Sequence, residues 1–519
     1  MMEFIAVNMA PIMFASLVLF LLYGYPVAFA LAANGLLFFV IGVELAPLSN
    51  GTINLSWPLL NAMPERLWGV MSNETLLAIP FFTFMGIVLE KSGMAEDLLD
   101  TIGQLFGPIR GGLAYAVVIV GALLAATTGV VAASVIAMGL ISLPIMLRYG
   151  YDRRVATGVI AASGTLAQII PPSLVLIVLA DQLGRSVGDM YQGALVPGLV
   201  LTAFYVGYVA LIAIFKPERV PALPLEARTL RGGKLLLRVV TSLLPPLLLI
   251  FLVLGTIFLG IATPTEGGAM GAFGALVLAM MRRRIDMKQL KQAMESTARL
   301  TTFVVMILIG ARVFSLTFYG VEGHLWVEHL LSGLPGGEVG FLIVVNILIF
   351  LLAFFLDFFE LAFIVVPLLA PAAEKLGIDL IWFGVLLGVN MQTSFMHPPF
   401  GFALFYLRSV APASIKTTQI YWGAVPFVII QIIMVGVLIA FPQLVTMGLD
   451  KQVEVDTDTV EIVVPGSDVP EDENAPVHFD ETPKEGADAP AGADAIPAPG
   501  ADDDAAKALE KAMQGGDKK

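Results

Sequence analysis

Long apolar stretches follow one another along most of this chain, and they restrict its fold more than any other feature. A bilayer core about 30 Å thick is crossed by roughly 20 apolar residues of α-helix. Apolar stretches occupy residues 4–24, 27–43, 75–90, 112–147, 155–180, 192–215, 239–260, 264–281, 299–319, 339–373, 380–411 and 420–447. They are continuous rather than alternating, and lipid offers the backbone no hydrogen-bond partner. The pattern therefore predicts an all-α polytopic membrane protein with some broken helices.

The composition agrees with a membrane location. Of 519 residues, 57% are hydrophobic and 14% charged, whereas soluble proteins carry about 25% charged residues. This balance excludes a water-soluble enzyme, a coiled coil and a nucleic-acid binder. There is no cysteine, which excludes disulfides, thiolate nucleophiles and cysteine-ligated metals. The N-terminus has no basic segment and no cleavage site, so we expect a first membrane span there rather than a cleaved signal peptide.

The net charge of −13 belongs entirely to the C-terminal tail. Residues 450–519 contain 19 acidic and 6 basic residues, and the rest of the chain is neutral. The tail is rich in Ala, Asp, Glu, Pro and Gly and cannot bury enough apolar surface to fold alone. We expect a disordered extension over 448–519, with a docking segment for a partner as the alternative.

The chain repeats several landmarks at one spacing. At an offset of 227 residues, Pro108 falls on Pro335, Pro144 on Pro371, Gly150 on Gly377, Asp152 on Asp379, and Pro171–Pro172 on Pro398–Pro399. The matches lie in turn-forming residues rather than in overall identity. They predict a structural repeat of 72–215 and 298–447.

Loop charges indicate that the two copies are inverted. The first copy carries arginines in its loops (Arg110, Arg148, Arg153 and Arg154), where the second carries mainly glutamates (Glu322, Glu328, Glu338 and Glu374). Basic loops stay in the cytoplasm, as we also expect for the basic stretches 216–238 and 282–291. The expected organisation is N-terminal scaffold spans (1–71), a first repeat (72–215), basic loops with two linking spans (216–297), a second repeat (298–447) and a tail (448–519). We expect the tail in the periplasm.

Two proline pairs interrupt apolar stretches at corresponding places in the repeats. One lies in ASGTLAQIIPPS (162–173) and the other in VNMQTSFMHPPFG (389–401). Proline lacks the amide donor and clashes with the preceding turn, so each pair ends a helix inside the membrane. Paired interrupted helices in two repeats mark a transporter binding site. A kink that only shapes packing is the alternative.

Residues with side-chain oxygens lie beside both breaks. Hydroxyls and freed carbonyls make a hard-oxygen site suited to Na⁺, and half-helix N-termini suit an anionic group. The hydroxyl candidates are Ser163 and Thr165 in the first copy, and Thr393 and Ser394 in the second. Asn390, Gln392 and the Pro398–Pro399 pair belong to the same candidate stretch.

A second pair of interruptions contains the acidic candidates. Thr127, Thr128 and Gly129 interrupt one long apolar stretch, and the corresponding stretch contains Asp357 and Glu360. A carboxylate at the bilayer centre costs about 3 kcal/mol or more, so it normally faces a cavity, a cation or a partner. Asp357 is our preferred acidic ligand for a coupling ion. Carboxylates near the interface, or protonated ones, are the alternative.

Two further charged residues stand in or between spans. Arg312 is a lone cation that could contact an anionic substrate or pair with a carboxylate. Glu266, in the turn Thr263–Gly268, is better explained as part of a structural turn than as part of a site. The sequence has no Walker, HExxH or GxSxG motif, which argues against ATP hydrolysis and against an intramembrane hydrolase.

Several motifs resemble those of the large membrane subunit of TRAP transporters, the tripartite ATP-independent periplasmic family. They are SNETLLAIPFFTFMGIVLEKSG (72–93), ASGTLAQIIPPS (162–173), YQGALVPG (191–198), TPTEGGAMGAFGAL (263–276) and VNMQTSFMHPPFGFALFY (389–406). The resemblance covers residues 1–447. It implies an elevator-type carrier driven by a Na⁺ gradient, with no other cofactor. It also implies two partners, a small four-helix membrane subunit, here expected as a separate chain, and a periplasmic substrate-binding protein.

The resemblance also implies ion ligands. One Na⁺ site would involve Thr127–Gly129, Gly164 and the Pro171–Ser173 tip, which includes Pro172. The other would involve Asp357 and the Gln392–Ser394 stretch, with Thr393 as a ligand. Many family members have a serine-rich segment where this chain has Thr-Thr-Gly.

We therefore expect Na⁺-coupled uptake of an organic acid across the bacterial inner membrane. The alternatives are a passive anion channel, and an elevator-type carboxylate carrier that works without a binding protein. The substrate itself is not specified by these motifs.

Overall fold

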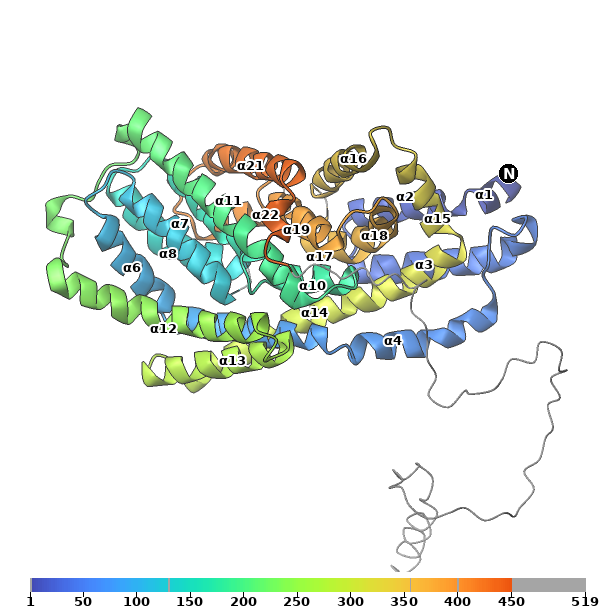
Figure 1. Ribbon diagram of the computed structural model, residues 1–519, viewed down its shortest axis with the longest axis horizontal. Coiled ribbons are helices and arrows are strands. Elements are labelled where there is room, and N and C mark those ends of the chain that lie inside the picture. Colours follow the sequence, from blue (N-terminus) through green and yellow to red (C-terminus); the bar gives the residue numbers. More distant parts are fainter. Residues whose placement is uncertain (1, 129–130, 355, 399–400, 450–519) are drawn as a thin grey trace, which may run out of the picture. The chain divides into compact units, whose positions relative to one another are not determined.

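The computed structural model describes residues 2–128, 131–354, 356–398 and 401–449. The predictions for Gly129, Pro399 and the acidic tail from 450 onward lie outside these residues. Within the described ranges the secondary structure is entirely helical, with no strand, as predicted (Figure 1).

Six described helices are long and apolar enough to cross a membrane. They are α3 (Val27–Leu45), which continues into η1 (Ala46–Leu48), α8 (Val131–Arg148), α11 (Val187–Phe215), α12 (Gly232–Phe258), α14 (Met287–Gly320) and α21 (Thr417–Ala440). A bent pair, 57–71 with 75–91, would make a seventh span. This confirms the prediction of a multi-pass helical membrane protein.

The remaining elements are shorter than these six or, in the case of α13, less apolar. They are α1 (Met2–Val7), α2 (Met9–Leu22), η2 (Trp57–Ala62), α4 (Met63–Met71), η3 (Thr75–Leu77), α5 (Ala78–Lys91), α6 (Met94–Phe106), α7 (Gly112–Thr128), η5 (Pro217–Arg219), η6 (Leu225–Ala227), α13 (Pro264–Met281), α15 (Gly323–Ser332), α16 (Gly337–Leu352), α17 (Phe358–Glu360), η7 (Leu361–Val365), α18 (Val366–Lys375) and α22 (Gln443–Thr446). The hairpin elements α9, η4, α10, α19, η8 and α20 are given below.

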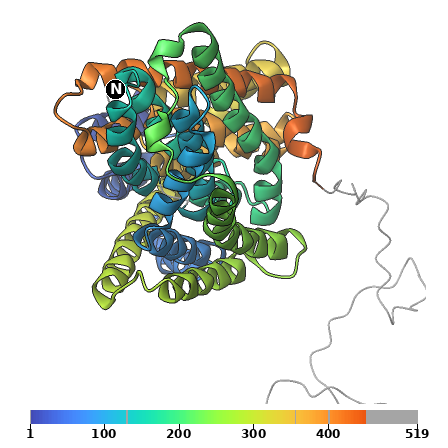
Figure 2. The same cartoon turned by 90° about the vertical axis from the view of Figure 1, so that its left-hand side faces the viewer.

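One group of helices packs through small residues. The long helix α14 lies against α3, and α13 lies against α5. These helices are in the lower part of Figure 1 and of the turned view in Figure 2. A Cβ on Gly310 would lie 2.3 Å from the carbonyl oxygen of Ala28, so only glycine permits this approach of α14 to α3. Close backbone contact of this kind is how helices associate in lipid, where burial gives little driving force. We call α3, α5, α12, α13 and α14 the scaffold helices.

Two helical hairpins lie in a second group. The first consists of α9 (Arg153–Thr165), η4 (Leu166–Gln168) and α10 (Leu174–Gln182), and the second of α19 (Leu380–Met391), η8 (Gln392–Phe395) and α20 (Phe402–Val410). With 13 residues, α9 is about 20 Å long and cannot cross the bilayer alone. As the sequence predicts, helices end in both interrupted stretches, with η4 ending at Gln168, before Pro171, and η8 at Phe395, before Pro398.

The hairpins begin with the same local structure. Gly150 and Gly377 both have left-handed backbone angles, with φ of +82° and +76°. Two residues later, the side chains of Asp152 and Asp379 accept hydrogen bonds from backbone N–H groups in the first turns of α9 and α19. Such N-caps satisfy donors that lipid would leave unpaired. The landmarks found at the 227-residue offset therefore form matching turns.

Glu266, in the turn between α12 and α13, has a structural role. Thr263 Oγ1 accepts from the N–H of Glu266, and a Glu266 carboxylate oxygen accepts from the N–H of Thr263 at 2.8 Å. This capping box starts α13 and agrees with the interpretation of Glu266 as a turn residue.

Candidate functional site

A cavity of about 1110 Å³ separates scaffold helices from the hairpin ends. One wall is formed by the α2–α3 turn (21–29) and by one face of α14 between Glu295 and Met306. The opposite wall combines the start of α8, parts of both hairpins, and the segment 357–360. Residues far apart in sequence thus meet around one space. From the predicted breaks, Gln168, Phe395 and the segment 357–360 line it, whereas Thr165, Gln392, Thr393 and Ser394 do not.

The first hairpin tip is held together by Ser173. Its hydroxyl donates to the carbonyl of Gln168 at 2.5 Å and caps α10 by accepting from the N–H of Leu176. Tyr191 donates its phenol hydroxyl to the carbonyl of Ser173. Gln168 lines the cavity, and its buried Oε1 has no hydrogen-bond partner among the described residues. Pro171 and Pro172 lie buried in the turn between the two helices.

The second tip contains a denser set of polar side chains. Asn390 donates to the backbone carbonyl and to the side-chain oxygen of Asn346, at 2.8 and 2.9 Å. Thr393 donates to the carbonyl of Asn390 at 2.6 Å. Gln392 Oε1 and Ser394 Oγ are buried without a partner in the described part of the chain. Buried oxygens without donors are unusual and indicate room for a cation or water.

The two tips are joined by one buried hydrogen bond. Gln392 Nε2 donates to Thr165 Oγ1 at 3.1 Å, and Thr165 itself donates to the carbonyl of Ala162. Gln431 Nε2 donates to the hydroxyl of the buried Tyr205. Buried polar networks of this kind fix the mutual position of the helices that carry them. Two candidate residues from separate hairpins are therefore in direct contact.

Asp357 and Glu360 form a capping box at the start of α17. Asp357 Oδ1 accepts from the N–H of Glu360, and Glu360 Oε2 accepts from the N–H of Asp357, both at 2.9 Å. Both residues are half-buried and line the cavity. The carboxylates that the sequence singles out are thus held at the cavity wall by the backbone of a helix start.

The start of α8, after the first interruption, is also at the cavity. Helix α7 ends with Thr127 and Thr128, and α8 begins at Val131, which lines the cavity. Ser163 and Gly164 lie behind the first tip, where the Ser163 hydroxyl donates to the carbonyl of Val159. They are not part of the cavity lining.

Gly164 is a close-packing position. A Cβ there would lie 2.3 Å from a methyl group of Val135, which belongs to α8. Helices α8 and α9 therefore approach one another this closely only because residue 164 has no side chain. Pro398, half-buried, follows the second tip.

The cationic residue on the cavity wall is Arg299 rather than Arg312. Both arginines are exposed on α14, but Arg299 lines the cavity, together with Glu295 and Thr302, and Arg312, 13 residues further along, does not. Arg299 pairs with Glu295 at 2.7 Å. Sequence reasoning missed these residues because an i, i+4 charge pair is typical of a solvated helix face. The sequence feature that could have identified them is the spacing of Glu295, Arg299 and Thr302, which puts all three on one face of the helix.

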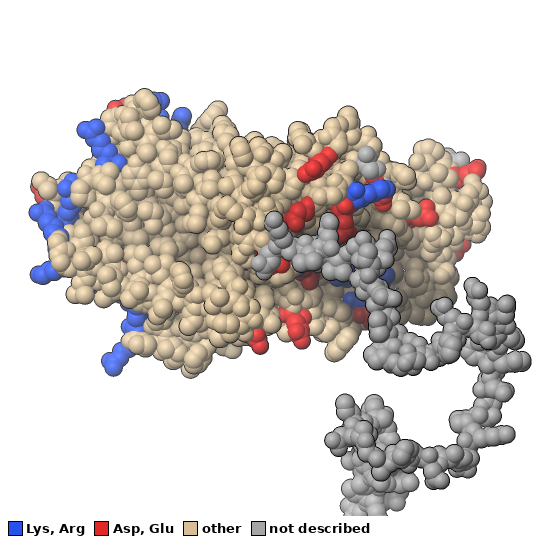
Figure 3. Space-filling view, viewed as in Figure 1, with Lys and Arg blue, Asp and Glu red and all other residues tan. Residues whose placement is uncertain are grey.

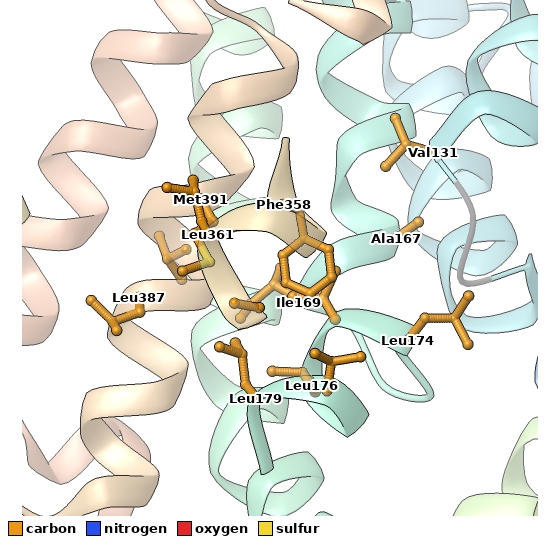
Figure 4. Close-up of a cluster of buried hydrophobic side chains, with 14 of the residues drawn as sticks. Val131, Ala167, Ile169, Leu174, Leu176, Leu179, Phe358, Leu361, Leu387 and Met391 are labelled. Atoms are coloured by element: carbon orange, nitrogen blue, oxygen red, sulfur yellow. The ribbon is translucent and has the colours of Figure 1, made fainter. Parts of the chain in front are cut away.

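Apolar side chains support the hairpin wall from behind. Phe358 lies close to Ile169 of the first tip, with Leu361, Leu387 and Met391 around it (Figure 4). All five are buried. A close-packed apolar layer fixes the position of the polar groups in front of it.

Comparisons with known proteins identify the family. Residues 14–444 match the model of "Tripartite ATP-independent periplasmic transporter, DctM component". The chain is 32% identical to the C4-dicarboxylate TRAP transporter large permease protein DctM of Pseudomonas aeruginosa, over 74% of this chain and 88% of that protein. It is 30% identical to the protein of the same name from Vibrio cholerae, over 80% and 92%. The sialic acid TRAP transporter permease protein SiaT of Haemophilus influenzae is 26% identical, over 75% and 62%.

Solved structures show the fold in more distant proteins. The Alcanivorax borkumensis YdaH transporter superposes with a TM-score of 0.56 at 15% identity, covering 79% of this chain and 98% of that one. Neisseria gonorrhoeae MtrF gives a TM-score of 0.51 at 12% identity, covering 79% and 94%. Together with the family match over nearly the whole body, these findings confirm the resemblance noted from the motifs. The chain belongs to the DctM family, and is the large permease component of a tripartite ATP-independent periplasmic transporter.

Proposed function

We propose that this permease carries an organic acid into the cell by Na⁺-coupled secondary transport, after a periplasmic binding protein has delivered it. The observation that carries the proposal is the cavity between α14 and the two hairpin tips. It joins a guanidinium group, suited to an anion, to oxygen-rich broken helices, suited to a cation.

The substrate class follows from Arg299 and from the named relatives. A guanidinium presents paired N–H donors that match a carboxylate. Relatives of this chain are named for C4-dicarboxylates, sialic acid and isethionate, which are all organic anions. We assign Arg299 as the anion-facing residue. Arg312, the substrate contact predicted from the sequence, is the second candidate for this role.

The coupling ion is assigned to the hairpin tips. Gln168, Gln392 and Ser394 each have a buried oxygen without a partner among the described residues. Such oxygens, with the carbonyls at helix ends, are the hard ligands that Na⁺ takes in broken-helix carriers. Asp357, which lines the same cavity as Gln168, supplies the negative charge. Thr127, Gly164 and Thr393 are further proposed ligands.

An elevator movement would shift the hairpins relative to the scaffold helices. The matching turns at Gly150 and Gly377 support an inverted repeat, as does the contact between Thr165 and Gln392 at the repeat spacing. In such a carrier, opposite ends of the repeat pair expose the site in turn. The protein would lie in the bacterial inner membrane, where a small four-helix membrane subunit would hold the scaffold. The acidic tail would lie in the periplasm.

Reconstitution into proteoliposomes tests the proposal. The chain, its small subunit and a cognate binding protein are expected to accumulate a radiolabelled organic acid only with an inward Na⁺ gradient. Downhill flux without accumulation would indicate a passive anion channel. Accumulation without the binding protein would indicate an independent carboxylate carrier. Either result overturns the proposed function.

A further inference from the structure

Three guanidinium groups surround one carboxylate at the end of the scaffold. Asp97, in the first turn of α6, has Arg238 and Arg284 at 3.2 and 3.4 Å from Oδ1, and Arg282 at 3.2 Å from Oδ2. The arginines come from α12 and from the segment after α13, so three elements meet here. Arg282 also donates to the carbonyl of Thr241 at 3.0 Å. We call these four residues the Asp97 cluster.

The cluster has more positive charge than its single carboxylate neutralises. Glu96 and Asp100, on the same helix, are exposed and form no ion pair with any described residue. Asp286 accepts from the N–H of Gln289 as the N-cap of α14. Two guanidinium charges therefore remain in excess. The side chains of Arg238 and Arg284 are each 46% exposed, whereas that of Arg282 is 23% exposed.

Apolar side chains are exposed directly beside these charges. On α12, Leu237 and Val240 flank Arg238 and are 66% and 45% exposed. On α13, Met280 and Met281 precede Arg282 and are 52% and 76% exposed. Figure 3 shows that lysines and arginines gather at the end of the molecule where α12 begins. Excess positive charge next to a lipid-facing surface is the composition of an interface with the cytoplasmic leaflet.

We propose that the Asp97 cluster binds the phosphate of an anionic phospholipid. Arg238 and Arg284 donate to the phosphodiester oxygens, and Arg282 stays paired with Asp97 and holds the cluster together. Guanidinium groups bind phosphate oxygens through paired N–H donors. The exposed side chains of α12 and α13 contact the acyl chains. The site joins α6, α12 and the segment after α13, and is independent of the substrate and of the coupling ion.

Native mass spectrometry of the full-length chain tests the site. The purified protein is titrated with phosphatidylglycerol, with phosphatidylcholine and with inorganic phosphate. We expect phosphatidylglycerol to bind more tightly than phosphatidylcholine. Each arginine near an anionic surface contributes about fivefold in affinity, so R238Q/R284Q is expected to weaken phosphatidylglycerol binding about 25-fold. The matched control K288Q/K291Q removes two exposed charges from the next helix and is expected to leave binding unchanged.

A second variant separates lipid binding from a structural role. Asp97→Asn removes the competing carboxylate and keeps all three arginines, so it is expected to tighten phosphatidylglycerol binding. Equal losses in R238Q/R284Q and in K288Q/K291Q would show a diffuse charge effect and overturn the proposal. So would weaker lipid binding by Asp97→Asn. Inorganic phosphate that binds as tightly as the lipid, and displaces it, would identify free phosphate as the ligand and overturn the lipid assignment.

Discussion

Gln392 donates a hydrogen bond of 3.1 Å to Thr165, a residue exactly one repeat spacing away, 227 positions earlier in the chain. Residues that correspond in an inverted repeat meet only where the local two-fold axis passes between them. The bond therefore supports an axis at the hairpin tips. It also places the proposed ion ligands of both halves within one buried network.

The bond itself predicts energetic coupling between the two tips. T165V and Q392L each remove one partner, and the double variant removes both. A buried hydrogen bond contributes about 1 kcal/mol, so a double-mutant cycle is expected to show coupling of about fivefold in the Na⁺ concentration for half-maximal uptake. T202V, which loses a bond within α11, serves as the control. Strictly additive effects would show that the tips act separately.

Asp357→Asn is expected to abolish Na⁺-driven uptake without loss of expression. Asparagine is as good an N-cap as aspartate, so the start of α17 is preserved while the negative charge is lost. Uptake driven by an inward Na⁺ gradient in proteoliposomes measures the effect. Glu338→Gln, at an exposed position of α16, is the control. Wild-type Na⁺ dependence in Asp357→Asn would remove Asp357 from the ion site.

Arg299→Gln is expected to raise the substrate concentration for half-maximal uptake by about tenfold or more. Hydrogen bonds to charged groups contribute about 1.5–3 kcal/mol, and the variant removes such donors from the cavity wall. Arg312→Gln removes the same charge from an exposed position of the same helix. If Arg312→Gln had the larger effect, Arg312 would be the substrate residue.

Gly158→Ala is expected to destabilise the protein. A Cβ at this position would lie 2.1 Å from the carbonyl oxygen of Gly423, so α9 would have to move away from α21. Gly207→Ala, in α11, meets no atom within 4 Å and is expected to be neutral or stabilising, since alanine favours helix. Thermal unfolding in detergent compares the two, and equal midpoints would contradict the packing argument.

Relative movement of the hairpins and scaffold can be tested by cross-linking α18, which packs against the hairpin helices α10 and α19, to α15, which packs against the scaffold helix α14. Lys375 of α18 pairs with Glu328 of α15, a helix that also packs against α2 and α14. The chain has no native cysteine, so E328C/K375C introduces the only thiols. A short bifunctional thiol reagent is expected to stop uptake in this variant and not in either single variant. Full activity after complete cross-linking would exclude movement between α15 and α18.

The sequence predicts the breaks better than it predicts the cavity. A proline pair ends a helix through local sterics, so residues 171–172 mark the first tip without any knowledge of the fold. The turns at Gly150 and Gly377 are equally local. The contact between Thr165 and Gln392 depends on how two hairpins pack, and no local pattern specifies that packing. Arg299 was missed for the same reason, since its role depends on which helix faces α14.

The cavity is built from two walls that come from different parts of the chain. Arg299 and Thr302 belong to α14, whereas Asp357 and Gln168 belong to the opposite wall. A mutation on α14 changes the size or charge of the space without altering the backbone of the helix breaks. Under the proposed assignments, substrate preference can therefore diverge among relatives through changes on one helix, while the residues assigned to the coupling ion stay the same.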